Sequence, residues 1–348
     1  MREGCELRKV KEICDKASSN IAQKEIVGLS GDYPVYGASG YVQSVDFFHR
    51  DKPYIGIVKD GSGVGRVNTY PAKTSLLGTL QYIIPKDGYL LGYVAYLLKS
   101  LNLAKFATGA AIPHIYFKEY GECKVPVPPI AEQEKIVAEL DCLTGIIEKK
   151  KQQLEELDKL AQSIFYDMFG DPINNEKGWK TERIERKCNL KAGKAIKATE
   201  LSPDPKNNSY ACFGGNGIRG YIHKKSHQGV FPIIGRQGAL CGNVVLAQGE
   251  FYATEHAVVV SPNTEDLNPV WLFFNLKLLN LNRLAKGVAQ PGLSVKELNK
   301  IDLIIAPLDR QNEFAKKIEA IEKQKELVKR SIEETETLFN SRMDYWFN

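Results

Sequence analysis

Two stretches of the chain repeat apolar side chains at alternating steps of four and three residues, one from 136 to 168 and one from 314 to 346. This 3.5-residue period predicts helices that each present a coiled-coil seam, whereas an ordinary amphipathic face repeats every 3.6 residues. A lysine interrupts each seam near its middle, Lys150 in the first and Lys325 in the second. The apolar seam positions are Ile136, Leu140, Leu143, Ile147, Leu154, Leu157 and Ile164, then Phe314, Ile318, Ile321, Val328, Ile332 and Phe339.

The two predicted helices lie 178 residues apart in one chain and have the same register, so we expect them to pair with each other. At a rise of 1.5 Å per residue, each makes a rod of roughly 55 Å. The alternative is that each helix packs only on its own domain. A seam sustained over five heptads favours a helical partner instead.

Short β-type runs and turn residues fill the chain before each long helix. The runs are "YIGIV" at 54–58, "LQYIIP" at 80–85, "GVFPIIG" at 229–235 and "HAVVVSP" at 256–262. One helical pattern interrupts them in each half, at 92–102 and at 269–280. The pattern predicts an α+β fold, with two tandem mixed α/β domains separated by the two long helices.

An internal repeat relates the two halves. "YPVYGASG" at 33–40 precedes "YACFGGNG" at 210–217 by 177 residues. Order and spacing persist over about 160 residues although few residues are identical, which indicates a tandem duplication. At the same offset Ile57, Gly61, Gly65 and Val67 return as Ile234, Gly238, Gly242 and Val244, and one residue later Gly109, Pro113, Pro129 and Gln133 return as Gly287, Pro291, Pro307 and Gln311.

The glycine-rich stretch "IVKDGSGVGRV" at 57–67 raises the question of a nucleotide site. A phosphate cradle needs G-x-G-x-x-G between a strand and a helix, yet no helical pattern follows here. The second copy keeps only the outer glycines, as Gly238 and Gly242, with Leu240 in the place of Gly63. The shared pattern therefore predicts a hairpin turn in which glycine supplies a positive φ or a close chain approach.

Charge alternates along the chain in four blocks. The net charge is +4 over residues 1–128, −4 over 129–170, +6 over 171–306 and −1 over 307–348. The basic blocks alternate with acidic or neutral helical blocks, which indicates that the blocks have different functions. The basic blocks favour an anionic partner.

Seven cysteines without a C-x-x-C pair predict neither a disulfide framework nor a thiolate zinc site, and they favour a reducing, cytoplasmic setting. The longest apolar run, 89–98, is shorter than the roughly 18 to 20 residues of a membrane helix. The charged first residues predict no targeting segment. We therefore expect a cytoplasmic protein that does not contact a membrane.

A search for catalytic chemistry finds no candidate. The nearest approach to an amino-methyltransferase [ND]-P-P-[YF] loop is "NPVW" at 268–271, which lacks the second proline. "SPDPKNN" at 202–208 has the letters of a nuclease motif without the strands that would hold magnesium. His223 and His227 could hold a metal at i, i+4, but the intervening residues are basic. No catalytic residue, metal ligand or cofactor is therefore predicted.

Basic, aromatic and amide residues concentrate in the predicted loops. DNA is bound through such side chains, because Arg and Lys contact guanine and phosphate while Asn and Gln contact adenine. The two halves differ most in these loops, as expected if one scaffold reads two sequences. The candidates are Tyr41, Gln43, Arg50, Lys59, Ser62, Lys105 and Thr108 in the first half, and Arg219, Tyr221, Lys224, Lys225, Arg236, Gln237, Lys286 and Gln290 in the second.

Two motifs carry a resemblance to a known family, "VPVPPIAEQEKIVAELD" at 125–141, which leads into the first long helix, and "FYDMFGDP" at 165–172. Through them the chain resembles the DNA specificity subunits of type I restriction-modification systems, the HsdS family. A degenerate copy, "APLDRQNEF" at 306–314, occupies the second expected position, with Arg310 in the place of Glu132. The resemblance covers essentially the whole chain. It implies target-recognition domains at residues 1–128 and 171–306, with the helical regions 129–170 and 307–348 packed as an antiparallel coiled coil.

The resemblance further implies a function and partners. Each recognition domain would read one half of a bipartite double-stranded DNA target, while the helices set the spacer between the halves. Two modification subunits would dock alongside and bring the restriction subunits, which leaves this chain without catalytic activity of its own. The residues leave one alternative open, a duplicated coiled-coil adaptor whose basic loops meet acidic proteins and have no DNA specificity.

Overall fold

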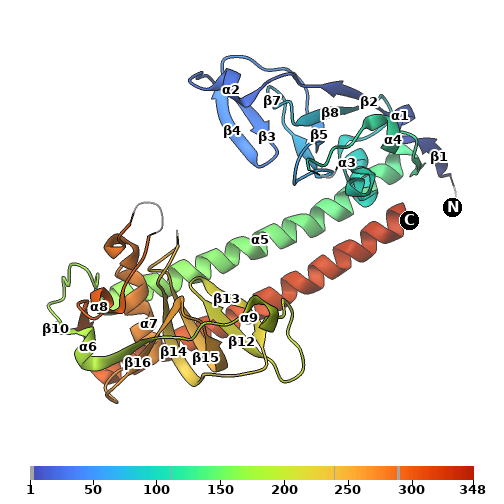
Figure 1. Ribbon diagram of the computed structural model, residues 1–348. Coiled ribbons are helices and arrows are strands. Elements are labelled where there is room, and N and C mark those ends of the chain that lie inside the picture. The colour runs from blue at the N-terminus through green and yellow to red at the C-terminus, as the bar shows by residue number, and fades with distance from the viewer. Residues whose placement is uncertain (1–3, 110, 239, 288–290) are drawn as a thin grey trace. The chain divides into compact units, whose positions relative to one another are not determined.

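The computed structural model describes residues 4–109, 111–238, 240–287 and 291–348, and its chain forms two compact units. Residues 1–151 and 330–348 make up the first unit, and residues 152–329 make up the second. Each long helix belongs to both units, because α5 runs from Ile130 to Phe169 and α9 from Leu308 to Phe347 (Figure 1).

Three antiparallel or mixed sheets form the first unit. A four-stranded sheet has the order β2-β8-β5-β6, a three-stranded sheet has the order β4-β3-β7, and β1 pairs with β9. The strands are β1 (Glu6–Lys9), β2 (Cys14–Ser18), β3 (Tyr33–Gly37), β4 (Gly40–Val45), β5 (Tyr54–Val58), β6 (Val67–Tyr70), β7 (Ser75–Leu76), β8 (Leu80–Pro85) and β9 (Lys124–Val127).

The second unit repeats this plan with one larger sheet. Six strands lie in the order β11-β16-β14-β15-β12-β13, and β10 pairs with β17. Because β15 is long, it pairs with β14 and also, in parallel, with β12. The strands are β10 (Lys180–Arg183), β11 (Cys188–Ala192), β12 (Tyr210–Gly214), β13 (Gly217–Ile222), β14 (His227–Gly235), β15 (Val244–Ala253), β16 (Ala257–Pro262) and β17 (Asp302–Ile305).

Short helices connect the strands in the same order in both units. The predicted helical patterns form α3 (Leu91–Ser100) and α7 (Pro269–Leu278), each followed by a 3-10 turn, η1 (Leu103–Phe106) or η3 (Leu281–Leu284). The mixed α/β prediction for both halves is confirmed. The remaining short helices are α1 (Val10–Ile13), α2 (Gln23–Ile26), α4 (Phe117–Tyr120), α6 (Ile184–Lys187), η2 (Ala198–Glu200) and α8 (Val295–Leu298).

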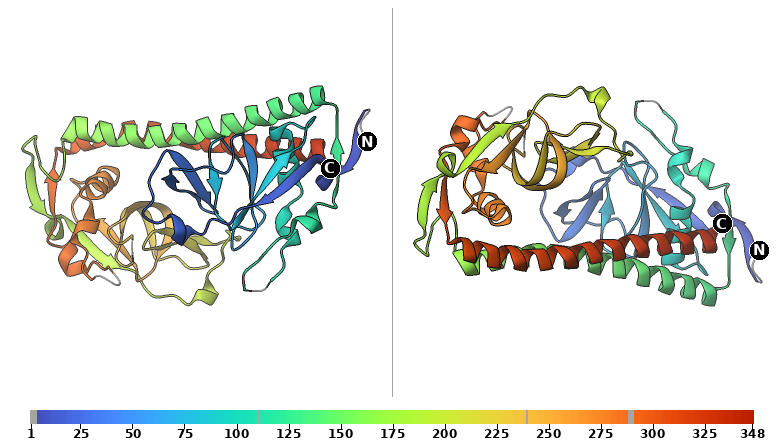
Figure 2. Two further views of the ribbon diagram at one scale, coloured as in Figure 1. Left: turned by 90° about the horizontal axis from the view of Figure 1, so that it is seen from above. Right: turned by 90° about the horizontal axis from the view of Figure 1, so that it is seen from below.

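The paired helices bury the predicted seam. Ile136 and Leu140 pack in the core of the first unit together with the end of α9, and Phe314 and Ile318 pack in the core of the second together with the end of α5. All the predicted apolar seam positions are buried or half-buried. The helices run antiparallel, since Glu139 bonds Arg342 in the first unit while Asp158 bonds Lys325 in the second (Figure 2). The coiled-coil prediction is confirmed.

A buried glutamine fixes the start of each long helix. Gln133 donates from Nε2 to the Pro128 carbonyl at 3.0 Å and accepts the Leu90 amide at 3.0 Å through Oε1. Its repeat, Gln311, donates to the carbonyl of Ala306 at 2.8 Å and accepts the amide of Asn268 at 2.8 Å. Both helix starts are thus tied to the loop before α3 or α7 in the same way.

The glycine-rich stretch forms a hairpin turn in both units, as predicted. β5 pairs with β6 around it through Ile57 and Val67, and β14 pairs with β15 around its copy. The outer glycines adopt positive φ, 89° and 87° at Gly61 and Gly65 and 87° and 88° at Gly238 and Gly242. The central Gly63 has no positive φ, which explains why the second copy carries a leucine there.

Candidate nucleic-acid interface

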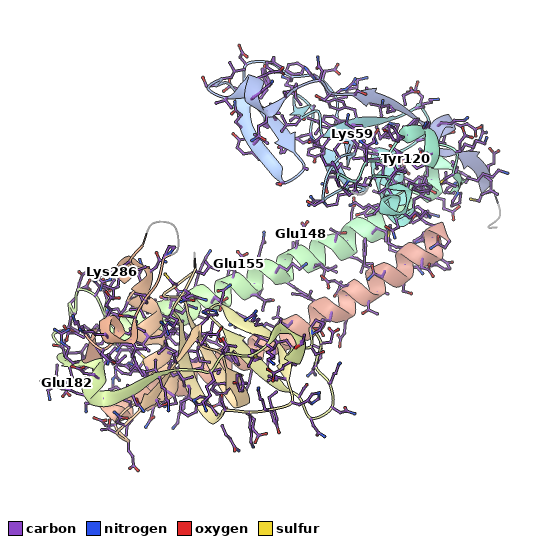
Figure 3. All side chains as sticks on the ribbon, viewed as in Figure 1. Lys59, Tyr120, Glu148, Glu155, Glu182 and Lys286 are labelled. Atoms are coloured by element: carbon purple, nitrogen blue, oxygen red, sulfur yellow. The ribbon has the colours of Figure 1, made fainter. Side chains whose placement is uncertain are left out.

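Two loops lie side by side in each unit and carry many of the candidate residues. The amide of Gly61 donates to the Pro113 carbonyl at 2.9 Å, and the amide of Gly238 donates to the Pro291 carbonyl at 3.0 Å. Each unit therefore has one surface made from its glycine hairpin and from the loop that precedes α4 or α8. Figure 3 labels one lysine on this surface in each unit, Lys59 and Lys286.

In the first unit this surface gathers Lys59, Ser62 and Thr108. Thr108 exchanges backbone hydrogen bonds with His114, whose ring contacts the carboxylate of Asp60 beside Lys59. Lys105 lies on the neighbouring turn η1, against which the hairpin packs through Gly65. The structure thus brings these four candidates to one side of the unit.

The other first-half candidates lie on or after β4. Tyr41 is 62% exposed, and its hydroxyl is 3.2 Å from that of Ser44. The Gln43 amide instead donates to the carbonyls of Ile26 and Leu29, so it already has backbone partners. The Arg50 guanidinium lies 4.6 Å from the centre of the Tyr82 ring, half-buried.

In the second unit Arg236, Gln237 and Lys286 lie on the equivalent surface. Gln237 and Lys286 both form backbone bridges with Gly292, the residue that takes the place of His114. Lys286 Nζ is 2.5 Å from Glu297, and this pairing is the main reason that the pKa of Glu297 falls to about 2. Gln290, the remaining candidate of this loop, lies outside the described residues.

The basic cluster on β13 divides into two parts. Arg219 is exposed, and Tyr221 further along the strand is half-buried. Lys224 and Lys225 follow the strand and pair with Glu200 and Glu250, and the pKa of each lysine is raised chiefly by its carboxylate partner. The Arg219 guanidinium, by contrast, makes no hydrogen bond or ion pair within the part of the chain that the structure describes.

Both units have a hollow that sequence reasoning missed, at the turn between β3 and β4 in the first unit and at the turn between β12 and β13 in the second. The first hollow has a volume of about 800 Å³, and residues 20–23, 37–39, 41–42 and 77–79 line it. The second hollow is lined by Gly214, Asn216, Arg219, Gln237 and His256, and encloses about 470 Å³. The sequence signal for it was the repeat offset, because residues 37, 39, 42 and 79 return at 214, 216, 219 and 256.

The three histidines of this region each contact a different group and do not form a metal site together. The ring of His223 is 3.2 Å from the carbonyl of Asn208, while His227 stacks on Phe251. His256 contacts Glu255 next to it at 3.1 Å. Among the residues that the structure describes, no group of three or more His, Cys, Asp or Glu side chains could hold a metal ion, and no helix is long and apolar enough to cross a membrane.

Comparison with known proteins finds one family. Residues 2–159 and again residues 176–337 match the type I restriction modification DNA specificity domain. The chain is 39% identical over 191 residues to the type I restriction enzyme EcoprrI specificity subunit of Escherichia coli, a match that covers 53% of this chain and 47% of that protein. It is 25% identical over 230 residues to the putative type I specificity subunit S.MpnORF201P of Mycoplasma pneumoniae, covering 65% and 94%. The chain thus spans about half the length of the Escherichia coli relative.

Solved structures show the same fold. The S subunit of a type I restriction-modification system from M. genitalium aligns with a TM-score of 0.63 at 17% identity, over 99% of this chain and 96% of that one. A second chain, from a study of complex assembly and conformational transition of the type I R-M system, aligns with a TM-score of 0.55 at 14% identity. The tandem α/β domains with two long helices are therefore an architecture already seen in solved structures.

Proposed function

The chain belongs to the type I restriction modification DNA specificity family, and on that premise we propose that it is the sequence-specific DNA-recognition subunit of a type I restriction-modification complex. Residues 1–128 and 171–306 are the two target-recognition domains, and residues 129–170 and 307–348 are the helical regions between and after them. Each domain reads one half of a bipartite double-stranded target. The chain is not itself an enzyme, and it acts on DNA in the cytoplasm.

One observation carries this proposal. The two units hold their hairpin and loop with the same backbone hydrogen bonds, while the side chains on that surface differ. One copy has half-buried Lys59 and exposed Thr108, and the other has half-buried Arg236 and exposed Lys286. If the side chains that contact DNA vary independently in two copies of one scaffold, the two copies can recognise two different half-sites. The basic residues supply the phosphate contacts that position such a protein on DNA.

The paired helices suit the docking of other subunits. Several large apolar side chains remain exposed on them although their seam is closed, among them Ile146, Leu160, Leu327 and Leu338. We assign these exposed apolar positions of the helices to contacts with two modification subunits, through which restriction subunits join the complex. Exposed apolar residues on a helix pair are consistent with a further helical partner.

Methylome sequencing of the source cell, before and after deletion of this gene, tests the proposal directly. We expect one bipartite methylated motif to disappear on deletion and to return when the gene is restored. An unchanged methylome would contradict the proposal.

Salt dependence separates DNA recognition from the adaptor alternative. Binding of the purified complex to DNA should weaken by several powers of ten between about 50 and 200 mM salt if six or more phosphates are contacted. An adaptor would instead bind an acidic protein and show no preferred DNA sequence.

A matched deletion tests whether the helices set the spacer. Lys150 contacts Ser331 and Lys325 contacts Asp158, so residues 151–157 face residues 324–330. Deleting both heptads keeps the seam in register and shortens the helix pair by about 10 Å. We expect the spacer to shorten by up to about three base pairs, at 34 to 36 Å per turn of DNA, with both half-site sequences unchanged. The original spacing at undiminished affinity would show that the helices do not set it.

A further inference from the structure

The two hollows share one wall of equivalent residues in the duplicated fold, Gly37, Val42 and Thr79 in the first unit and Gly214, Arg219 and His256 in the second. In the first unit the amide of Lys59 donates to the Thr79 carbonyl at 3.0 Å, and in the second the amide of Arg236 donates to the His256 carbonyl at 3.0 Å. Thr79 and His256 each line their own hollow. The same backbone contact thus joins each hollow to the surface already assigned to DNA.

A β-bulge presents one side chain of each hollow. β3 and β4 shift register between Val35 and Tyr36, so that Val42 is left without a partner in the ladder. β12 and β13 shift at the equivalent place, and the unpaired residue is Arg219. A bulge of this kind re-aims a side chain, and it is kept here in both copies although the side chain itself changes.

A glycine lies beneath the bulged residue in both copies. A Cβ added at Gly37 would lie 3.1 Å from Val42 Cγ2, and one added at Gly214 would lie 3.6 Å from Arg219 Cβ. The bulged side chain therefore rests over the end of the preceding strand, at the wall of its hollow. The geometry is common to the two units and only the chemistry differs.

The linings of the two hollows differ in chemical character. Val42 and Thr79 line the first hollow, together with polar residues such as Asn20 and Gln23. Their counterparts in the second are the guanidinium of Arg219 and the imidazole of His256, and Asn216 replaces Ser39. The two hollows thus differ at two equivalent positions, where valine and threonine in the first unit are replaced by arginine and histidine in the second.

The polar groups of the second hollow are available for a ligand. Within the described residues, neither the Arg219 guanidinium nor the side-chain amide of Gln237 makes a hydrogen bond or ion pair, and His256 Nδ1 is buried without a partner. In the first hollow's unit the residue at the position of Gln237 is Asp60, which is already engaged by His114. Arg219 and Gln237 are therefore open to a ligand in the second hollow.

Resting on the proposed function, we infer that the two hollows are base-reading sites, which receive the major-groove edges of base pairs. Arg219 reads guanine through its O6 and N7 atoms, and Gln237 reads adenine through N6 and N7 at a neighbouring pair. In the first hollow Val42 and the Thr79 methyl contact the C5-methyl group of thymine. The bulged residue is the specificity-determining position in both domains.

The test is selection of random duplex DNA by the complex, isolated from the source cell through a tag on this chain. Arg219→Val places in the second hollow the residue of the first. It should lower discrimination for guanine at one position of one half-site by roughly ten- to a hundredfold, and leave the other half-site unchanged. Val42→Arg is the reciprocal variant, and it should introduce a guanine into the opposite half-site.

Lys225→Ala is the matched control, because Lys225 is a basic residue just beyond the same strand and outside the hollow. It should weaken binding to all sequences alike and leave the selected motif as it was. If Arg219→Val behaves in that same way, Arg219 contacts phosphate and the inference is wrong. An unchanged motif in Arg219→Val and Val42→Arg, each with wild-type thermal unfolding, also overturns it.

These outcomes are distinct from failure of the proposed function. If the wild-type complex selects no motif at all, the chain is not a specificity subunit. If the wild-type complex selects a bipartite motif that the two bulge variants leave intact, only the assignment of the hollows is wrong. Should either bulge variant lower thermal stability, Arg219→Gln keeps a hydrogen-bonding side chain at the same place, and it should shift the preference from guanine toward adenine.

Discussion

The two units share their interior supports and differ at their hollows. Gln133 and Gln311 make the same hydrogen bonds at the start of the long helices, and Gly65 and Gly242 bring each hairpin against the following 3-10 turn. The bulged residue, by contrast, is valine in one unit and arginine in the other. The difference shows which positions the fold constrains. Residues with buried bonds or no room for a side chain persist through the duplication, while the bulged residue at each hollow is free to change.

The largest expected effect concerns a matched pair of cysteines, which report on each unit separately. Cys14 follows α1 in the first unit and Cys188 follows α6 in the second, and burial raises the pKa of both thiols to about 12. Since a free cysteine has a pKa of about 8.5, alkylation at pH 8 should be slower than for a free thiol by at least about three powers of ten. Exposed Cys142 is the control. Mass spectrometry after pulsed alkylation measures all three, and equal rates would contradict the shared burial.

Substituting the packed glycine of either hairpin should have the next largest effect. A Cβ at Gly242 would lie 2.4 Å from the Asn282 backbone nitrogen, and one at Gly65 would lie 2.5 Å from that of Ala104. Left-handed strain together with this clash should cost Gly242→Ala about 3 to 4 kcal/mol of unfolding free energy. Pulsed alkylation of Cys188 along a denaturant series measures the loss.

Gly238→Ala is the control, because φ is also positive there but no atom lies within 4 Å of the added Cβ. It should cost only about 1 to 2 kcal/mol. The same contrast should hold between Gly65→Ala and Gly61→Ala, measured through Cys14. If Gly242→Ala lowered the free energy of unfolding much more than Gly65→Ala, or the reverse, the two hairpins would not be held in the same way.

Replacing either buried glutamine should lower the free energy of unfolding by a smaller amount, and by the same amount in both units. Gln311→Met keeps the length of the side chain but leaves the carbonyls of Ala306 and Asp266 and the amide of Asn268 without their partner. We expect a loss of about 2 to 3 kcal/mol in chemical unfolding, and the same for Gln133→Met.

Arg310→Ala is the control for the second helix start, since Arg310 is exposed and pairs only with Glu313 within the described residues. It should change stability by less than about 0.5 kcal/mol. This outcome would also show that Arg310, in the place of Glu132, does not alter how the helix start is held. A loss in Gln133→Met that is far from that in Gln311→Met would show that the two starts are held differently.

The elements that depend on local pattern could be predicted from the sequence. The seam follows from a 3.5-residue period, and the hairpin glycines follow from comparing two copies, in which Gly63 and Leu240 occupy the position that needs no positive φ. The order of the six-stranded sheet could not be predicted, because β11 pairs with β16 across more than 60 residues of chain. Such pairings depend on the whole core and not on one segment.

The surface could be predicted only in part for the same reason. Composition singled out Gln43, Lys224 and Lys225, but the amide of Gln43 turns to the backbone of a preceding loop, and the two lysines meet Glu200 and Glu250 from distant segments. His256 lies at the start of a β-type run, so the sequence predicted only local packing or hydrogen bonding for it. The second hollow forms where three loops converge, and no single stretch of the sequence indicates that these loops lie together.

The smallest expected effect separates the two seam lysines. In the first unit Lys150 contacts the hydroxyl and carbonyl of Ser331, whereas in the second Lys325 bonds the carboxylates of Asp158 and Glu322 at 2.8 Å each. Burial, the largest influence, lowers the pKa of Lys325, but the two carboxylates together raise it further, so that its pKa lies above the usual value. A raised pKa in the folded state stabilises the fold fully below the unfolded pKa, about 10.4, and this stabilisation is lost as the pH rises through the folded value.

Lys325→Met should therefore cost about 0.5 to 1 kcal/mol at pH 7, and the cost should shrink as the pH is raised beyond about 10.4. Lys150→Met removes only a contact with a neutral serine from an apolar seam, so at pH 7 it should be neutral or stabilise by about 0.5 kcal/mol. Chemical unfolding of both variants from pH 7 to pH 11 measures the difference. Equal stabilisation by the two substitutions at pH 7 would show that the carboxylates contribute nothing, and that the seam lysines are interchangeable although their partners differ.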